Sequence, residues 1–397
     1  MKQVTKFYLA SFLKNQIYFV PIIVLFFQDL SLNYTQIFWV FTIGSAFAFL
    51  IEIPTGLIAD TYGNRRSIII SKFLIFISFI FFGSAQGFVG IMLANLVYEL
   101  GKSFRSGTET AYVYNYLNFD KEAPRYTKVK INQKFYARIS ESLAALLGGF
   151  VAYRLGFSAV FFLAAIPALI NFIQTLTWTK LPSEEKREKP SLSFKKQISF
   201  IKDAFSSLRQ NKMARRVILN ISVFSTAFVA LDKFIQPYMK MSGLNLQDFG
   251  TVYAVFLIIV AFVVKFAARL EEKWGGVKIM NYTTYLAFVP LVFLALGANS
   301  VFMIALFFLV LIIDNFRSPV ANTLFHDNIS SDKRATMGSI LELFKSVNNL
   351  WFLPFIGYLA DIYSIKIAIL IIAIFLLLGG TFFLLKEEKT QVVADLN

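Results

Sequence analysis

The sequence of 397 residues contains no cysteine and a single histidine, His326. Without cysteine the chain has no disulfide, no thiolate metal site and no thiol nucleophile. One histidine leaves almost nothing for a histidine-based metal site or a Ser-His-Asp triad. We therefore expect no enzymatic activity, no bound metal and no cofactor.

Charge is also scarce, because only 16% of the residues are charged, against roughly 25% in globular proteins. Apolar residues make up 57% of the chain, and the mean hydropathy is +0.62. A segment that spans a bilayer must satisfy its backbone hydrogen bonds internally, which favours helices. We predict an all-α integral membrane protein with twelve spans, each long enough to cross a core of about 30 Å. The predicted spans are 6–28, 34–58, 67–86, 88–112, 130–153, 157–178, 216–240, 247–269, 277–298, 300–325, 335–359 and 364–385.

The 39 Lys and Arg residues are unevenly distributed around these spans. With the N-terminus in the cytoplasm, 28 of them fall on the cytoplasmic side, eight lie within spans, and the other side has Arg154, Lys240 and Lys366. This split is the positive-inside signal. We therefore predict a multi-pass protein of the bacterial inner membrane with both termini cytoplasmic, and we expect it to contact lipid rather than nucleic acid.

Two short patterns recur in the two halves of the sequence. An acid, a glycine and a cation at intervals of three residues occur at Asp60, Gly63 and Arg66, and again 212 residues later at Glu272, Gly275 and Lys278. A Gly-x-x-Ala pattern occurs at Gly149–Ala152 and again at Gly357–Ala360. Because both halves carry six spans in the same orientation, we predict parallel repeats related by a pseudo-two-fold axis along the membrane normal.

The loop after the second span contains Gly56, Asp60, Gly63, Arg65 and Arg66 in the spacing G-x-x-x-D-x-x-G-x-R-R. With twelve spans and a long middle loop around it, this pattern resembles the major facilitator superfamily of secondary transporters, and within it the drug:proton antiporter branch. The resemblance implies two six-helix bundles that move about a central cavity. It also implies that this loop holds the bundles together on the cytoplasmic side when the transporter opens outward.

The chemistry of the loop agrees with a gating role. We expect Asp60 to cap a helix end, Gly63 to permit a tight turn, and Arg65 and Arg66 to reach acids or helix C-termini. The sequence departs from the antiporter pattern at Val97, where many exporters of the family carry arginine, and it lacks their proline before Gly148 and Gly149.

The predicted domains are an N-terminal bundle (1–179), a cytoplasmic linker (180–215) and a C-terminal bundle (216–397). In the linker, Ile198, Ile201, Phe205 and Leu208 recur at helical spacing among lysines and arginines. This pattern predicts an amphipathic helix on the inner membrane surface.

Charged residues inside the spans need a reason, because each costs at least about 2.5–3.5 kcal/mol on insertion scales. Four pairs are spaced i,i+3, so that the partners share a helix face and can neutralise one another. They are Glu99/Lys102, Arg138/Glu141, Asp314/Arg317 and Glu342/Lys345. Lys14 and Lys265 lie near the cytoplasmic ends and are expected to reach the membrane surface.

Depth within the spans predicts a network of Arg105, Glu109, Arg138 and Glu141 in the N-terminal bundle. The repeat predicts its counterpart in the C-terminal bundle, made of Asp314, Arg317, Glu342 and Lys345. A proton carrier must load and release a proton, so a carboxylate without a cation on its face is favoured. Asp232 and Lys233 are adjacent and are expected to point apart, which ranks Asp232 first for proton coupling, then Glu99, then Glu52.

Polar and aromatic side chains within the spans are candidates to line a central cavity, and buried amides in particular need partners. The leading candidates are Tyr98, Tyr136, Asn348, Asn349 and Trp351.

The leading hypothesis is an alternating-access transporter, monomeric and proton-driven, that exports amphipathic small molecules. One alternative is an importer of a polar metabolite, with Arg105, Arg138 or Arg317 as ligands. A second alternative, from another class, is a lipid flippase or scramblase or a polytopic membrane enzyme.

Overall fold

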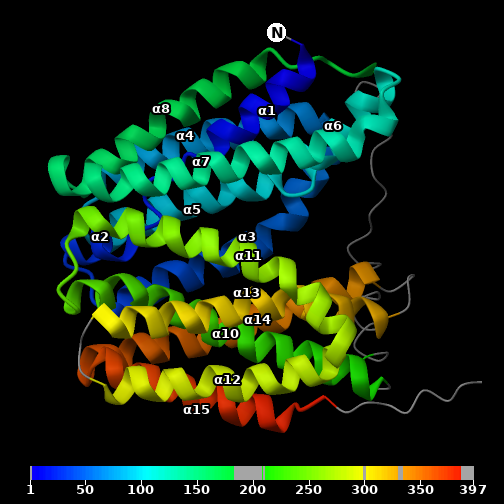
Figure 1. The fold of residues 1–397 in the computed structure, drawn as a ribbon. Helices are drawn as coiled ribbons and strands as arrows, with labels where there is room; N and C mark the ends of the chain where they lie inside the picture. Colours follow the sequence, from blue (N-terminus) through cyan, green and yellow to red (C-terminus); the bar gives the residue numbers. More distant parts are fainter. Residues whose placement is uncertain (1, 183–207, 209–210, 298–300, 330–333, 386–397) are drawn as a thin grey trace, which may run out of the picture.

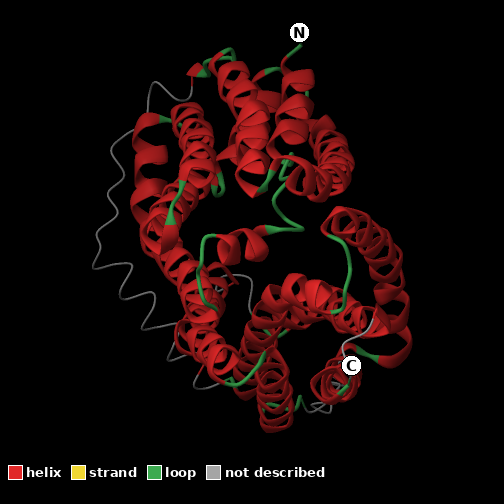
Figure 2. Cartoon of the chain, turned by 90° about the vertical axis from the view of Figure 1, so that its left-hand side faces the viewer, coloured by secondary structure: helices red, strands yellow, loops and turns green. Residues whose placement is uncertain are grey.

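The computed structural model describes residues 2–182, 208, 211–297, 301–329 and 334–385. In these residues the chain forms α-helices joined by short connections, and no β-strand (Figures 1 and 2). The first half contains α1 (Gln3–Lys14), α2 (Ile23–Asp29), α3 (Tyr34–Tyr62), α4 (Asn64–Ser84), α5 (Gly87–Arg105), α6 (Thr108–Phe119), α7 (Tyr126–Leu155) and α8 (Phe157–Leu176). The second half contains α10 (Lys212–Met241), α11 (Phe249–Trp274), α12 (Gly276–Leu296), α13 (Val301–Asp327), α14 (Arg334–Ile362) and α15 (Ile365–Phe382). The predicted surface helix of the linker falls almost entirely outside the described residues.

Among the described residues, seven helices are long and apolar enough to cross a bilayer by length and composition, namely α3, α4, α8, α10, α12, α13 and α15. Charged residues weaken the hydropathy of others: α5 carries Glu99, Lys102 and Arg105, and α14 carries Glu342 and Lys345. The count of twelve spans stays a prediction, and so do the domain boundaries.

Two predicted spans are interrupted, which corrects the sequence analysis. The first, 6–28, is divided into α1 and α2 by residues 15–22, a stretch that contains Pro21. Proline has no N–H for the helical ladder, and its ring disfavours a helical residue before it. The fourth, 88–112, breaks at Gly107, whose φ of 71° is a left-handed conformation that glycine adopts readily.

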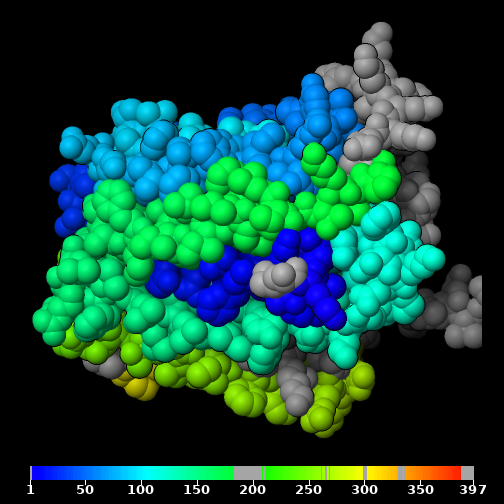
Figure 3. All heavy atoms as spheres, turned by 90° about the horizontal axis from the view of Figure 1, so that it is seen from above, coloured from blue at the N-terminus to red at the C-terminus, as the bar shows by residue number. Residues whose placement is uncertain are grey.

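Helix packing repeats between the halves. In the first half α1 packs against α7 and α8, α3 against α5, and α4 against α5 and α8. In the second half α10 packs against α14 and α15, α11 against α13, and α12 against α13 and α15. Each of these contacts in one half thus has its equivalent in the other, which agrees with the predicted repeat. Figure 3 shows one such contact from outside, with α1 between α7 and α8.

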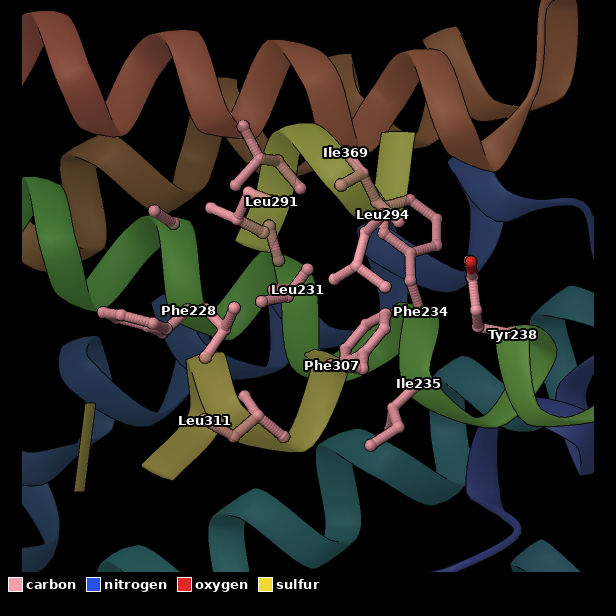
Figure 4. Close-up of a cluster of buried hydrophobic side chains, with 14 of the residues drawn as sticks. Phe228, Leu231, Phe234, Ile235, Tyr238, Leu291, Leu294, Phe307, Leu311 and Ile369 are labelled. Carbon is pink, nitrogen blue, oxygen red and sulfur yellow. The ribbon is translucent and has the colours of Figure 1, made fainter. Parts of the chain in front are cut away.

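Each half has its own apolar core. In the second half, side chains of α10, α12, α13 and α15 converge around Leu231, Phe234 and Phe307, all essentially buried (Figure 4). In the first half a similar cluster forms around Phe26, Phe161 and Ile91. Because lipid tails are as apolar as these side chains, close van der Waals packing rather than transfer out of water holds the helices of each half together.

The halves meet through α3 with α14 and through α7 with α11. Their hydrogen bonds gather at the end of the molecule where α3 begins and α14 ends, which we call the Asp361 end. There Val24 N–H donates to Gln236 Oε1 at 2.8 Å, and Gln236 Nε2 donates to Val20 O at 2.8 Å. The opposite end, which holds the turns at Gly63 and Gly275, we call the Gly63 end.

The repeated glycines Gly149 and Gly357 allow the close approach at the Asp361 end. A Cβ at Gly149 would lie 2.9 Å from Leu246 O, at the start of the second half's α11. A Cβ at Gly357 would lie 2.8 Å from Tyr34 O, at the start of α3. The two glycines therefore occupy equivalent positions in the two contacts between the halves.

Replacing Gly357 with leucine is expected to separate α14 from α3 and to lower the melting temperature of the purified protein. Overpacking of this kind costs about 1–3 kcal/mol. The matched control is Gly338→Leu in the same helix, because a Cβ at Gly338 meets nothing within 4 Å. Equal melting temperatures for the two variants would show that the approach at Gly357 is not tight.

Candidate functional site

A cavity of about 350 Å³ lies in the second half among α10, α11, α13 and α14. Three phenylalanines, Phe224, Phe228 and Phe256, form part of its wall. Five charged side chains line it as well: Asp232, Lys233, Asp314, Arg317 and Lys345. The cavity therefore combines an aromatic surface with two carboxylates and three cations.

Asp232 and Lys233 form an ion pair, contrary to the expectation that they point apart. Lys233 Nζ lies 2.9 Å from Asp232 Oδ2 and also lies 4.5 Å from the centre of the Phe41 ring. Neighbouring Cβ atoms do diverge on a helix, but the flexible stem of lysine is long enough to return to the preceding carboxylate. The first rank of Asp232 for proton coupling rested on the expectation that it has no cationic partner. The structure gives it one, Lys233.

Asp314 and Arg317 are close in sequence but do not form the predicted ion pair. Arg317, only 2% exposed, donates instead to Asn220 Oδ1, and its guanidinium lies 3.3 Å from the centre of the Phe224 ring. A planar guanidinium stacks well on an aromatic face, which competes with the carboxylate for its position. Asp314 consequently lines the cavity without an ion pair or hydrogen bond to any residue that the structure describes.

Glu342 and Lys345 form the predicted pair, with 2.8 Å between Glu342 Oε1 and Lys345 Nζ. Lys345 reaches the cavity, whereas Glu342 is largely exposed. The four residues predicted to form one network in the second half therefore do not do so. Glu342 pairs with Lys345. Arg317 instead contacts Asn220 and Phe224 of α10.

In the first half, Glu109 is the centre of a buried cluster. Its carboxylate lies 3.3 Å from Lys14 Nζ, 3.6 Å from Lys72 Nζ and 3.9 Å from Arg105 Nε. The pairing of Arg105 with Glu109 was predicted, whereas Lys14 turns inward instead of reaching the membrane surface. Lys14 does so because a buried carboxylate offers it a partner at the break between α1 and α2.

Arg138 and Glu141 form their own pair at 2.7 Å and do not join this cluster. Arg138 and Glu141 border a second cavity, of about 330 Å³, together with Lys14 and Glu109. The predicted network is thus divided into two pairs, Arg105 with Glu109 and Arg138 with Glu141. Glu109, Arg138 and Glu141 line this cavity, whereas Arg105 lines a smaller one.

The remaining coupling candidates have partners. Glu99 accepts a hydrogen bond from Lys102 Nζ at 2.9 Å, as the spacing predicts. Glu52 accepts one from the hydroxyl of Ser106 at 3.0 Å.

The two amides predicted to line a cavity instead join helices. Asn348 donates to Ser222 Oγ, and Asn349 accepts from Thr226 Oγ1, each at 2.8 Å. Both partners lie on α10, so these amides hold α14 against it, and neither lines the cavity of the second half.

The three predicted aromatic residues lie in different surroundings. Tyr98 packs among Phe19, Phe79 and Phe82 and borders a small cavity. Tyr136 lies beside Tyr8, and Trp351, half exposed, packs its edge against Phe352.

The two signature turns have the same geometry. Gly63 ends α3 with φ 94° and ψ 148°, and Gly275 ends α11 with φ 78° and ψ 142°. Both φ values are readily adopted only by glycine. The N–H of each glycine donates to the carbonyl four residues earlier, at 2.9 Å from Ala59 and 2.8 Å from Glu271.

Around the first turn, Arg65 donates from Nε to Trp178 O at 2.8 Å and from Nη2 to Leu176 O at 2.5 Å. This confirms that a cation of the loop reaches a helix C-terminus, here that of α8. Asp60 lies in the last turn of α3, which continues to Tyr62, and its capping role stays a prediction. The other loop residues are at the surface or partly exposed; they are Gly56, Arg66, Glu272 and Lys278.

Three residues of these sites were missed from the sequence. Lys72 is a lone cation in an apolar run, and this pattern could have revealed it. Asn220, the acceptor for Arg317, and Asp361, which bonds to the start of α3, have no local sequence signal. Their partners lie 97 and 327 residues away in sequence, so only the fold reveals these contacts.

The family model of the Major Facilitator Superfamily matches residues 7–347 of the chain. Transporters of this superfamily consist of two structural repeats in the same orientation. The repeated helix packing, the matching glycine turns and the charged cavities of this chain agree with that arrangement. The chain belongs to the major facilitator superfamily, and it is a multi-pass, all-helical membrane transporter of that fold.

Curated relatives include the MFS-type transporter YxaM of Bacillus subtilis, 21% identical over 262 residues. That match covers 64% of this chain and 64% of YxaM, slightly less than two thirds of each. The transporter BU466 of Buchnera aphidicola is 22% identical, and the match covers 73% of this chain and 72% of BU466. The MFS-type transporter MJ1560 of Methanocaldococcus jannaschii is 20% identical, and the match covers 94% of each chain.

Solved structures with the same fold include the nucleoside transporter NupG, with a TM-score of 0.79 and 15% identity over 96% of this chain and 98% of that one. A bacterial homologue of the human lysosomal transporter Spinster, in an inward-facing and unoccupied conformation, gives a TM-score of 0.74 and 16% identity over 96% and 95%.

Proposed function

We propose that the protein is a proton-coupled, alternating-access exporter of amphipathic small molecules. The observation that supports this proposal best is the cavity of about 350 Å³ with three phenylalanines beside five charged side chains. An amphipathic molecule can place an aromatic or aliphatic part on the rings and a charged group against a carboxylate or a cation. Substrate sites of such transporters lie near mid-depth where two repeats meet, and Lys233 of this cavity lies 4.5 Å from the centre of the Phe41 ring in the first half.

In this proposal the Asp361 end faces outward and is closed, and the cavity connects with the Gly63 end, on the cytoplasmic side. The positive-inside distribution of Lys and Arg supports this orientation. The turns at Gly63 and Gly275, with the cations that follow them, hold the cytoplasmic ends together in the opposite state.

We assign proton coupling to Asp314 in preference to Asp232, Glu99 and Glu52. Asp232 and Glu99 have lysine partners at 2.9 Å, and Glu52 accepts from Ser106. A carboxylate held by a fixed cation is a poor proton carrier. Asp314 lines the cavity, has no ion pair within the described residues, and can therefore exchange a proton with solvent and compete for a substrate cation.

The test of direction and coupling is transport in proteoliposomes under imposed pH gradients of either sign. We expect uptake of ethidium, an amphipathic cation, to accelerate when the lumen is acidic, because each entering molecule is exchanged for an outgoing proton. Liposomes without protein provide the control. Acceleration only when the lumen is alkaline would instead identify a symporter.

Import of a zwitterionic metabolite is the second candidate, because the cavity contains two carboxylates beside three cations. Arg317 would then bind the substrate carboxylate in the second half, and Arg105 or Arg138 would do so in the first. Movement of lipid that needs no gradient would favour a scramblase over both.

A further inference from the structure

The cluster around Glu109 contains more positive than negative charge. Three cations, Lys14, Lys72 and Arg105, surround this one carboxylate at 3.3 to 3.9 Å. They come from α1, α4 and α5, and Glu109 comes from α6. If all four groups are charged, the cluster has a surplus of two positive charges in the interior of the first half.

Lys72 is the least accessible of these cations. Its side chain is only 2% exposed, and its Nζ has no hydrogen-bond partner among the residues that the structure describes. The 3.6 Å to Glu109 Oε1 is an ion-pair distance but not a hydrogen bond. Burial of an ammonium group without hydrogen bonds is costly, so Lys72 is expected to be matched by a group other than Glu109.

Space for such a group lies directly beside Lys72. A cavity of about 50 Å³ is lined by Lys14, Lys72 and Arg105, with the polar side chains of Tyr98, Asn15 and Asn171. Apolar residues complete its wall, and no carboxylate of the described residues lines it. A small cavity with three cations, three polar side chains and no acid in its lining has the composition of an anion site rather than of a proton relay.

We propose that Lys14, Lys72 and Arg105 form a binding site for a small anionic group inside the N-terminal half. The group is a free anion of the size of chloride or formate, or the carboxylate of a transported molecule. The adjoining cavity of about 330 Å³ shares Lys14 and Asn15 with the site and has room for the remainder of such a molecule. Only this second source rests on the proposed transport function.

The experiment measures the melting temperature of the purified full-length protein in sodium camphorsulfonate. Chloride or formate is titrated in while camphorsulfonate is reduced, so that the ionic strength stays constant. We expect a saturable rise in the melting temperature with either small anion, because the apolar cage of camphorsulfonate is too large for a cavity of about 50 Å³ and meets mostly polar and charged side chains in the adjoining one. No saturable rise in the natural protein would overturn the proposal.

Lys72→Met keeps the length of the side chain and removes its charge, so the rise should be lost. Lys240→Met is the matched control, because Lys240 is exposed and lies in the other half, and the rise should be unchanged. A rise that persists in Lys72→Met would contradict the assignment.

If Lys72→Met does not fold, Glu109→Gln tests whether this cluster binds the anion. This change removes the only carboxylate of the cluster, and the apparent affinity for chloride should increase severalfold. An unchanged or weaker affinity would exclude the site.

Gluconate distinguishes the two sources of the anionic group, because the adjoining cavity is lined mostly by polar and charged side chains. Tighter binding of gluconate than of formate indicates a carboxylate whose polar part occupies the adjoining cavity, and equal or weaker binding indicates a free anion. Binding needs no gradient, so these results stand even if ethidium transport and proton coupling fail.

Discussion

Replacing Asp314 with asparagine is expected to abolish proton-driven transport while leaving exchange of substrate across the membrane intact. Asparagine has nearly the same size and lines the cavity equally well, but it cannot load or release a proton. Asp314 has no ion pair among the described residues, and Arg317 keeps its hydrogen bond to Asn220 and its stacking on Phe224 when the carboxylate is removed. The substrate path should therefore persist without the coupling.

Two assays in proteoliposomes separate these effects. In the first, ethidium uptake under an acidic lumen should fall to the rate without a gradient. In the second, exchange of labelled for unlabelled ethidium at equal pH should continue. Asp327→Asn is the matched control and should retain gradient-driven uptake, because Asp327 is on the same helix as Asp314 but is exposed and does not line the cavity. Normal gradient-driven uptake by Asp314→Asn would remove Asp314 from the mechanism.

Replacing Asp361 with alanine is expected to open the Asp361 end. Asp361 Oδ1 accepts from Tyr34 N–H at 2.8 Å, and Oδ2 accepts from Thr35 N–H at 2.8 Å and Thr35 Oγ1 at 2.6 Å. A residue of the second half thus caps the N-terminus of α3 in the first, where the helix dipole favours negative charge. Loss of a helix cap costs about 0.5–2 kcal/mol, and about 1.4 kcal/mol is a tenfold change in an equilibrium.

Cysteine labelling can measure this opening, because the natural chain contains no cysteine. A cysteine introduced at Phe38 replaces a fully buried side chain that packs on Phe234 of the other half. A membrane-impermeant maleimide should label this cysteine roughly tenfold faster in the Asp361→Ala background, if the cap is worth the typical ~1 kcal/mol or slightly more.

The control for this labelling is Asp29→Ala, a nearby exposed acid, which should leave the rate unchanged. Thr35→Val removes only the hydroxyl bond and should have a smaller effect than Asp361→Ala. Equal labelling rates for Asp361→Ala and Asp29→Ala would show that the cap does not hold this end closed.

The architecture could be predicted from the sequence because its signals are local or repeated. Runs of apolar residues specify helices, and the repeats at Gly63 and Gly275 specify the same turn twice, which the φ values of 94° and 78° confirm. The breaks at residues 15–22 and at Gly107 were missed, because a hydropathy pattern continues across a break in the backbone.

The contacts of the charged residues were harder to predict, because they depend on the direction of each side chain and on which helices the fold brings together. Helical spacing correctly paired Glu99 with Lys102 and Arg138 with Glu141. It failed for Arg317, because Asn220 and Phe224 on α10 compete successfully with Asp314. No local pattern could place Lys72 beside Glu109, since these residues lie on different helices.

Alternating access is tested most directly by measuring distances at both ends of the protein with pairs of spin labels. Cysteines at Ser31 and Tyr363 report the Asp361 end, and cysteines at Tyr62 and Trp274 report the Gly63 end; all four residues are exposed. When Asp361→Ala is added, the first distance should lengthen and the second should shorten. Distances that both stay unchanged, or that both lengthen, would contradict a transporter whose two ends open in turn.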